Sequence, residues 1–256
     1  MNSGPSLTPK YLRTSDLARE VGMHPNTVRR YADWGMIPPV ERSPAGYRRF
    51  TRRHLDCLRL VQLLYYNQYA GKPIRRSGIQ IIQTAVEGDL GGALELAYRH
   101  LALVQSERAQ ADVAASLLER WAFGVPADAT GQPLQIGQAA RLLGVTVDTL
   151  RNWERNGLIH IPRSPANGYR RYGATEISRL RVIRMLSRVG YSLSAVLRML
   201  LQLDQGETAD LRRALDTPRS DEDAYLASDR WISTLTEQEH RARAAIELVE
   251  SMIAGS

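Results

Sequence analysis

A chain of 256 residues is long enough for one large domain or two modest ones, each with its own core. Hydrophobic residues make up 43%, charged residues 24% and aromatic residues 7%, a globular composition that excludes a fibre or an unstructured tail. The single cysteine, Cys57, excludes an internal disulfide and a thiolate metal cage and indicates a reducing compartment. No run approaches the roughly 18 apolar residues of a membrane span, and the first residues lack an apolar signal core. We therefore expect a cytoplasmic protein without membrane contact.

The net charge of +7 is concentrated in two blocks. Residues 1–70 carry 11 basic and 5 acidic side chains, and residues 131–201 carry 11 and 3. The segment between them is nearly neutral, and residues 202–256 are acidic. Two basic blocks separated by a neutral segment favour two surfaces that bind a polyanion. The alternative is an arginine-rich solvated surface without a partner.

The two basic blocks are copies of one sequence. At an offset of 122 residues the copies share three glycine positions and a Tyr-Arg-Arg sequence: Gly22 and Gly144, Gly35 and Gly157, Gly46 and Gly168, Tyr47-Arg48-Arg49 and Tyr169-Arg170-Arg171. No gap is needed from Leu12 to Arg59. A match of this length indicates an internal duplication.

Each copy predicts two short helices joined by a tight turn. Apolar residues at helical spacing in 12–21 and 136–143 predict a first helix that stops at Gly22 or Gly144. The second helix is predicted to start at His24-Pro25 or at the capping Thr146 and to end before the next glycine. This is the helix-turn-helix plan, in which the second helix enters the major groove of DNA. A helical hairpin that only packs is the alternative.

A β-hairpin, or wing, is predicted after the second helix of each copy. Residues 36–40 and 158–162 have the pattern of short extended strands, and turn sequences with Ser-Pro-Ala follow them. The return strand is Tyr-Arg-Arg followed by Phe50 or Tyr172. Because adjacent strand residues face opposite ways, at least one arginine of each pair should point outward and reach phosphates.

The remainder of each copy predicts a helix pair and a long helix. In the first copy, helices are expected over 55–64 and 74–86, and the long helix runs from Leu90 to Ala122 with apolar residues recurring every seven. In the second copy, helices are expected over 177–189 and 193–203. A last helix follows, with a seam formed by Leu235, Ala242, Ile246, Val249 and Ile253.

Residues 12–61 and 134–183 resemble the DNA-binding region of the MerR family of bacterial transcription regulators. The resemblance implies a mainly α fold with two winged helix-turn-helix units, each followed by a helix pair and a long helix. It implies DNA-binding roles on the second helix and the wing. In the first copy these residues are Thr27, Arg29, Arg30, Tyr31, Tyr47, Arg48 and Arg49, and in the second Thr149, Arg151, Asn152, Trp153, Tyr169, Arg170 and Arg171. Asn26 and Asp148, from the divergent part of the second helices, complete the set.

The chain departs from the family pattern, because an ordinary member has one DNA-binding unit and one long helix. We expect an intramolecular pseudodimer whose two long helices pair antiparallel. Its predicted parts are a first winged unit (1–70), a helix with the first long helix (71–123), a linker (124–133), a second winged unit with its helix pair (134–203) and an acidic segment with the second long helix (204–256). A homodimer with four DNA-binding units is the alternative.

The resemblance implies a sequence-specific regulator that binds double-stranded DNA, works with RNA polymerase holoenzyme at a promoter, and bends or untwists the promoter. The second helices of the two copies carry different residues, which predicts an asymmetric operator with two unlike half-sites. The alternatives are an architectural or excisionase-like DNA-bending protein and a protein-interaction scaffold.

We expect no enzyme activity, no cofactor and no metal site. The sequence has no P-loop, GxSxG elbow or HExxH motif. Metal-responsive relatives use cysteines near the end of the long helix, whereas Cys57 follows the first wing and is expected to be a buried hydrophobe. The five histidines are expected at surface or capping positions. An effector is left open, including an apolar ligand near Tyr98, Trp121, Tyr225 and Trp231.

Overall fold

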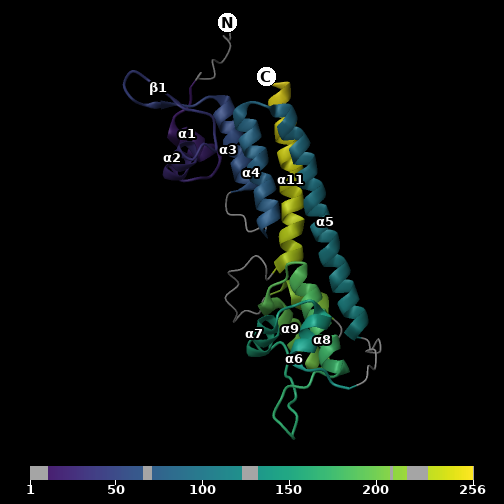
Figure 1. Ribbon diagram of the computed structural model, residues 1–256. Coiled ribbons are helices and arrows are strands. Elements are labelled where there is room, and N and C mark those ends of the chain that lie inside the picture. The colour runs from purple at the N-terminus through teal and green to yellow at the C-terminus, as the bar shows by residue number, and fades with distance from the viewer. Residues whose placement is uncertain (1–10, 66–70, 123–131, 208–209, 218–229, 256) are drawn as a thin grey trace. The chain divides into compact units, whose positions relative to one another are not determined.

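The computed structural model describes residues 11–65, 71–122, 132–207, 210–217 and 230–255 (Figure 1). Nearly all of the predicted linker, and Tyr225, lie outside these residues. The elements of the first copy are α1 (Thr14–Glu20), α2 (Pro25–Asp33), β1 (Glu41–Arg42), β2 (Arg48–Arg49), α3 (Arg52–Leu64), α4 (Gly71–Glu87) and α5 (Leu90–Ala122). Those of the second are α6 (Ile136–Leu143), α7 (Val147–Arg155), α8 (Ala174–Arg188), α9 (Leu193–Asp204), α10 (Leu211–Asp216) and α11 (Trp231–Ala254). Among the described helices, none combines the length and the apolar character that crossing a membrane requires.

The chain forms two compact units. Unit 1 contains residues 1–105 and 237–256, and unit 2 contains residues 106–236. Each unit includes one helix-turn-helix, and both long helices, α5 and α11, contribute residues to both units. The mainly α fold with two helix-turn-helix units is therefore confirmed.

The core of unit 1 joins the first helix-turn-helix to the last helix of the chain. Leu17 of α1, Val28 of α2 and Leu58 of α3 are fully buried in one cluster. Ile246 and Val249 of α11 belong to the same cluster. Apolar burial is the main favourable term in folding, so the C-terminal helix stabilises the N-terminal helix-turn-helix unit.

Within unit 1, α5 and α11 pair antiparallel. The hydroxyl of Tyr98 donates to the carboxylate of Glu250 over 3.1 Å, and the amide of Gln105 donates to Glu239 over 3.0 Å. As the residue number rises along α5, that of its partner on α11 falls. The predicted antiparallel pairing of the two long helices thus occurs within one chain.

Unit 2 repeats the helix-turn-helix and adds a short helix that the sequence analysis missed. Helix α10 packs on α9, and the buried guanidinium of Arg198 donates to the carbonyl of Ala214 over 2.6 Å. Residues of α5 join this unit as well, since Asp112 forms an ion pair with Arg212. A six-residue helix has little periodicity of its own, which is why only its tertiary contacts reveal it.

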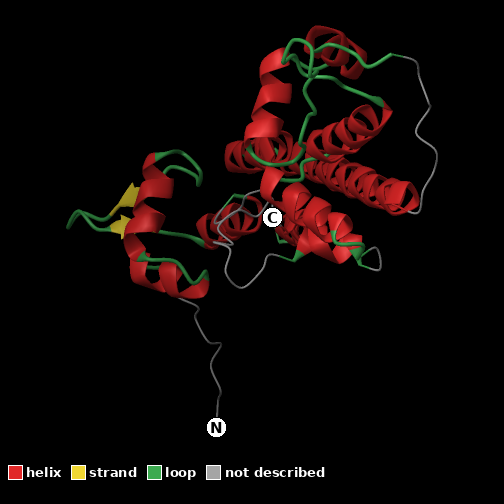
Figure 2. Ribbon diagram, turned by 90° about the horizontal axis from the view of Figure 1, so that it is seen from below, coloured by secondary structure: helices red, strands yellow, loops and turns green. Residues whose placement is uncertain are grey.

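The outgoing wing strands differ from the prediction, whereas β2 lies within the predicted return strand of the first wing. The outgoing strand of the first wing is β1, not 36–40, and it places Glu41 opposite Arg49 and Arg42 opposite Arg48 (yellow in Figure 2). The second wing has a single bridge, between Arg163 and Arg170. Pro38 and Pro39 have no N–H to donate to a ladder, so 36–40 was a poor candidate for a strand. Its Ile37 is buried in the core instead.

Candidate nucleic-acid interface

Three of the predicted DNA-binding residues of helix α2 have exposed side chains. Its N-cap is His24, whose Nδ1 accepts a hydrogen bond from the backbone N–H of Asn26 over 3.2 Å. The Arg29 guanidinium donates to the side-chain oxygen of Asn26 over 2.7 Å. Asn26, Arg29 and Arg30 are exposed, whereas Thr27 is partly buried. The helix therefore presents amide and guanidinium groups to solvent at its N-terminal end and middle.

Helix α7 presents the aligned residues with a different chemistry. Its N-cap Thr146 accepts from the N–H of Thr149 over 3.0 Å. Arg151 forms an ion pair of 3.2 Å with the carboxylate of Asp148. These two residues align with Arg29 and Asn26 of the first copy, where the arginine donates to an uncharged amide instead. Asn152 is partly buried and stands where the first copy has Arg30.

Two predicted DNA-binding residues lie in the core. Tyr31 and Trp153 are buried, and the Tyr31 ring meets that of Tyr65 edge-on at 6.1 Å. A buried ring cannot reach a base edge. We therefore exclude Tyr31 and Trp153 from the candidate interface, because their aromatic character serves packing.

The tyrosines of the wings are among the most exposed large side chains in the described part of the chain. Tyr47 is 76% exposed and Tyr169 is 68% exposed. Each follows a glycine with positive φ, Gly46 or Gly168, which closes the hairpin turn. Both phenols are thus available to a partner at the tip of a wing.

The two arginines of each wing have different surroundings. Arg48 forms an ion pair of 2.9 Å with Asp33 at the end of α2, and Arg170 forms one of 2.7 Å with Glu154 of α7. These two arginines connect the wing to the second helix of the helix-turn-helix. Arg49 lies over the ring of Tyr11 at 5.0 Å. Arg171, at the aligned position, is exposed and is the clearer candidate for a phosphate contact.

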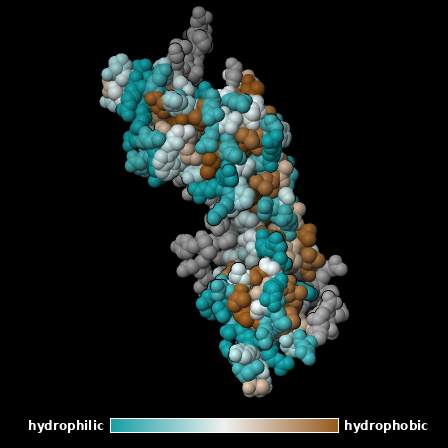
Figure 3. Space-filling view, in the orientation of Figure 1, coloured by the Kyte–Doolittle hydropathy of each residue, from teal (hydrophilic) through white to brown (hydrophobic). Residues whose placement is uncertain are grey.

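A basic groove in unit 1 brings the wing and α2 together. The groove has a volume of about 690 Å³, and its lining includes four predicted residues, Arg29, Tyr47, Arg48 and Arg49. It also includes residues that the sequence analysis missed: Tyr11, Arg13, Thr14, Ser15, Pro25 and Ser43. Hydroxyl and arginine side chains at a helix start are common phosphate contacts, so residues 11–15, around the start of α1, carried a usable signal. The surface visible in Figure 3 is mostly hydrophilic over both winged units.

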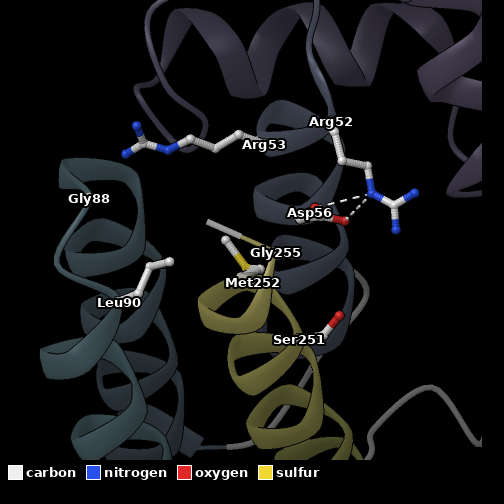
Figure 4. A pocket seen from close by; sticks show the side chains of 8 residues that line it. All are labelled: Arg52, Arg53, Asp56, Gly88, Leu90, Ser251, Met252 and Gly255. Atoms are coloured by element: carbon white, nitrogen blue, oxygen red, sulfur yellow. Dashed lines mark hydrogen bonds and ion pairs between the residues drawn. The ribbon is translucent and has the colours of Figure 1, made fainter. Parts of the chain in front are cut away.

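A second cavity in unit 1 lies between the start of α3, the α4–α5 turn and the end of α11 (Figure 4). Its volume is about 670 Å³, and it is lined by Arg52, Arg53, Asp56, Gly88, Leu90, Ser251, Met252 and Gly255. Arg52 pairs with Asp56 over 3.1 Å, and Arg53 donates to the carbonyl of Val86 over 3.0 Å. The charged groups of this cavity are therefore already engaged by the protein.

The cysteine and the histidines form no metal cluster in the part of the chain that the structure describes. Cys57 is fully buried, and burial raises the pKa of its thiol to about 11. His24 is the N-cap of α2, and His54, buried at the third position of α3, accepts a hydrogen bond from the backbone N–H of the N-cap Thr51 over 3.0 Å, so both have capping roles. His100 departs from the expectation, because it is buried in α5.

The geometry defines a class of protein: a winged helix-turn-helix protein with two such units in one chain. The sequence profile of the MerR HTH family of regulatory proteins matches residues 12–76 and 134–203, more than half of the chain. The chain therefore belongs to the MerR HTH family and has two of its helix-turn-helix units.

Individual relatives match about one unit. The chain is 40% identical over 73 residues to the mercuric resistance operon regulatory protein of Serratia marcescens, which covers 28% of this chain and 50% of that protein. It is 33% identical over 86 residues to a homologue of the HTH-type transcriptional regulator ZntR in Haemophilus influenzae. This alignment covers 32% of this chain and 63% of that protein. It is 34% identical over 77 residues to the HTH-type transcriptional repressor CarH of Myxococcus xanthus. This alignment covers 30% of this chain and 26% of that protein. The alignments with the mercuric regulators span about half of the length of those proteins. No solved structure gives a significant match.

Proposed function

We propose that this protein is a sequence-specific transcription regulator that binds double-stranded DNA as a single-chain pseudodimer. The observation that carries the proposal is the pair of helix-turn-helix units whose second helices differ at aligned positions, Arg30 against Asn152 and Asn26 against Asp148. Arginine favours guanine edges, asparagine favours adenine, and aspartate accepts from cytosine. Two unlike helices in one chain are therefore expected to read two unlike half-sites.

The second helix of each unit lies in the major groove in this proposal, and the wing contacts the adjacent backbone. Tyr47 and Arg49 serve the first half-site, and Tyr169 and Arg171 serve the second. Arg48 and Arg170 act indirectly, because their ion pairs with Asp33 and Glu154 hold each wing beside its helix. This division separates base-reading residues from residues that position the protein.

The regulator acts at a promoter together with RNA polymerase holoenzyme, and it bends or untwists the DNA between the half-sites. Such a deformation costs about 1–6 kcal/mol by elastic estimates, which the phosphate contacts of two wings offset. The protein works in the cytoplasm on the nucleoid, without enzymatic activity. Its parts are those expected from the sequence, with residues 124–133 as the linker between the former subunits.

Metal response is not part of the proposal, although two of the relatives above are a mercuric resistance regulator and a ZntR homologue. A thiolate is the form of cysteine that binds soft metals, and the buried thiol of Cys57 has a raised pKa.

Selection of random duplex DNA by the purified protein, followed by sequencing, tests the proposal. Two unlike half-sites at a fixed spacing are the expected result, and gel mobility of circularly permuted fragments carrying that site then measures the bend. Transcription from a promoter with the selected site should change when the protein is added to polymerase. A palindromic site would contradict the asymmetric reading. Enrichment of A·T-rich, easily bent DNA without a motif would favour the architectural alternative.

A further inference from the structure

Helix α2 is followed by an exposed tryptophan, Trp34, whose ring contacts two side chains of that helix: the ring of buried Tyr31, at 5.9 Å between centroids, and the guanidinium of Arg30. Trp34 is the C-cap residue of α2 and is 58% exposed. The guanidinium carbon of Arg30 lies 5.3 Å from the centroid of the Trp34 ring, within the range of a cation–π contact. The two residues are four apart, so the ring faces the side chain one turn earlier.

The second copy has a pair of residues in the same two positions with a different interaction. The side-chain amide of Asn156, the C-cap residue of α7, donates to the side-chain oxygen of Asn152 over 3.0 Å. It also donates to the backbone carbonyl of Asn152 over 2.8 Å. At the offset of 122 residues, Asn152 aligns with Arg30 and Asn156 aligns with Trp34. In both copies, therefore, the residue at the C-cap contacts the side chain one turn earlier: Trp34 contacts Arg30, and Asn156 contacts Asn152.

We propose that Trp34 and Asn156 are positioning residues that determine the base preference of Arg30 and Asn152. The proposal rests on the proposed function, since it assigns partners to two of its base-reading residues. Trp34 holds the guanidinium of Arg30 in one direction before DNA binds. Asn156 fixes which edge of the Asn152 amide is acceptor and which is donor, and a reversed amide would present the wrong pattern to adenine.

Restraint before binding matters because a free arginine or asparagine side chain loses rotamer freedom when it contacts a base. A side chain already held in the productive direction loses less, and it also discriminates better, since alternative contacts to the wrong base require breaking the restraint. Exchanging the restraining residue is therefore expected to change sequence preference more than overall affinity or stability.

The first experiment compares Trp34→Ala with Trp34→Tyr, using the site selected by the unaltered protein and single-base substitutions in each half-site. Trp34→Ala should reduce discrimination at one base pair of the first half-site by about two- to fivefold, the range of a surface cation–π contact. Trp34→Tyr keeps a ring and should retain most of the preference. The second half-site should be unaffected, and the melting temperature should hardly change because Trp34 is exposed.

The second experiment treats Asn156 in the same way. Asn156→Asp has the same shape but cannot donate, so it should reduce discrimination in the second half-site by about two- to tenfold, the range of one hydrogen bond. The sharper comparison is Asn152→Arg against Asn152→Arg with Asn156→Trp. The double variant should prefer guanine at the second half-site more strongly than the single variant, because it carries both members of the first copy's pair.

The outcomes separate this proposal from the proposed function. If the unaltered protein selects no sequence, the proposed function is overturned, and this assignment with it. If it selects two half-sites but Trp34→Ala and Asn156→Asp leave base discrimination unchanged, or weaken binding to all sequences equally, only the positioning role is overturned. A lower melting temperature with unchanged discrimination would show a structural role and would also overturn it.

Discussion

A histidine buried without a hydrogen-bond partner is a source of pH sensitivity. Both ring nitrogens of His100 on α5 lack a hydrogen-bond partner among the described residues. Burial disfavours the charged imidazolium and lowers the pKa of His100 from 6.5 to about 4. The folded protein therefore holds this ring neutral at neutral pH.

The free energy of unfolding should fall as the pH falls from about 6.5 towards 4. In that window the unfolded chain protonates His100 and the folded protein does not, so protons favour unfolding. The loss attributable to His100 should reach about 3 kcal/mol at the lower end of the window. Urea unfolding at pH 7.5 and pH 4.0 measures this loss, and His100→Leu should reduce the difference between the two pH values by that amount. An unchanged pH dependence in His100→Leu would contradict the argument.

Gly190 shows how closely a ring packs on the backbone in unit 2. It has a φ of +104°, which side chains rarely adopt. A Cβ added to it would lie 2.6 Å from Cε2 of Trp231, at the start of α11. The turn between α8 and α9 therefore requires glycine for two separate reasons.

Gly190→Ala should reduce the free energy of unfolding by more than about 2 kcal/mol, since it adds a steric clash to backbone strain. Thermal unfolding compares it with Gly206→Ala, whose φ of +80° is also positive but whose added Cβ would meet nothing within 4 Å. Equal destabilisation by the two variants would mean that the Trp231 contact has no energetic effect.

At the scale of elements, the wing and the recognition helix form one structure through an ion pair in each unit. Arg48 reaches Asp33, whose side chain is 63% exposed, whereas Arg170 reaches Glu154, whose side chain is 21% exposed. Solvent screens exposed pairs more strongly than partly buried ones. The second wing is therefore expected to be held more firmly than the first.

Removing the second arginine of each wing, Arg49 or Arg171, should weaken binding to all DNA sequences equally. If Arg49 and Arg171 each contact one phosphate, as in the proposed function, the slope of log affinity against log salt should decrease by about one for each of Arg49→Ala and Arg171→Ala. Fluorescence anisotropy with the selected site and with an unrelated duplex measures both quantities. Arg99→Ala on the exposed face of α5 is the matched control and should leave the slope unchanged. A loss confined to the selected site would assign these arginines to base reading instead.

At the scale of the whole molecule, the duplicated chain pairs its own long helices. Ala97 and Val104 of α5, and Ala242 of α11, are buried in the single chain. These residues of the two long helices are thus already covered by other parts of the same chain.

Multi-angle light scattering should give a mass near 28.7 kDa, that of one chain. The reason is that Ala97 of α5 and Ile246 and Val249 of α11 are already buried in one cluster within the chain, although Ile253 of the predicted seam is exposed. The DNA complex should contain one chain per selected site. A mass of two chains, in the free protein or on one site, would support the homodimer with four DNA-binding units.

The sequence predicted the elements whose signals are local. Glycine and capping residues marked the ends of α2 and α7, and apolar periodicity placed α5 at Leu90–Ala122, both ends of which are confirmed. The outgoing wing strands were misplaced because a strand of two residues carries almost no pattern, and α10 was missed for a similar reason. Local signals are sufficient for long helices and insufficient for short elements.

By itself, the sequence determined the duplication, the two helix-turn-helix units and the residue types on each recognition helix, since these depend on spacing along the chain. Only the tertiary structure decided which of those residues face outward. It buried Tyr31 and Trp153, and it paired Arg48 and Arg170 with acids about fifteen residues away in the chain. Exposure and pairing arise when separate elements pack together, and no spacing within one element encodes which neighbour will lie against it.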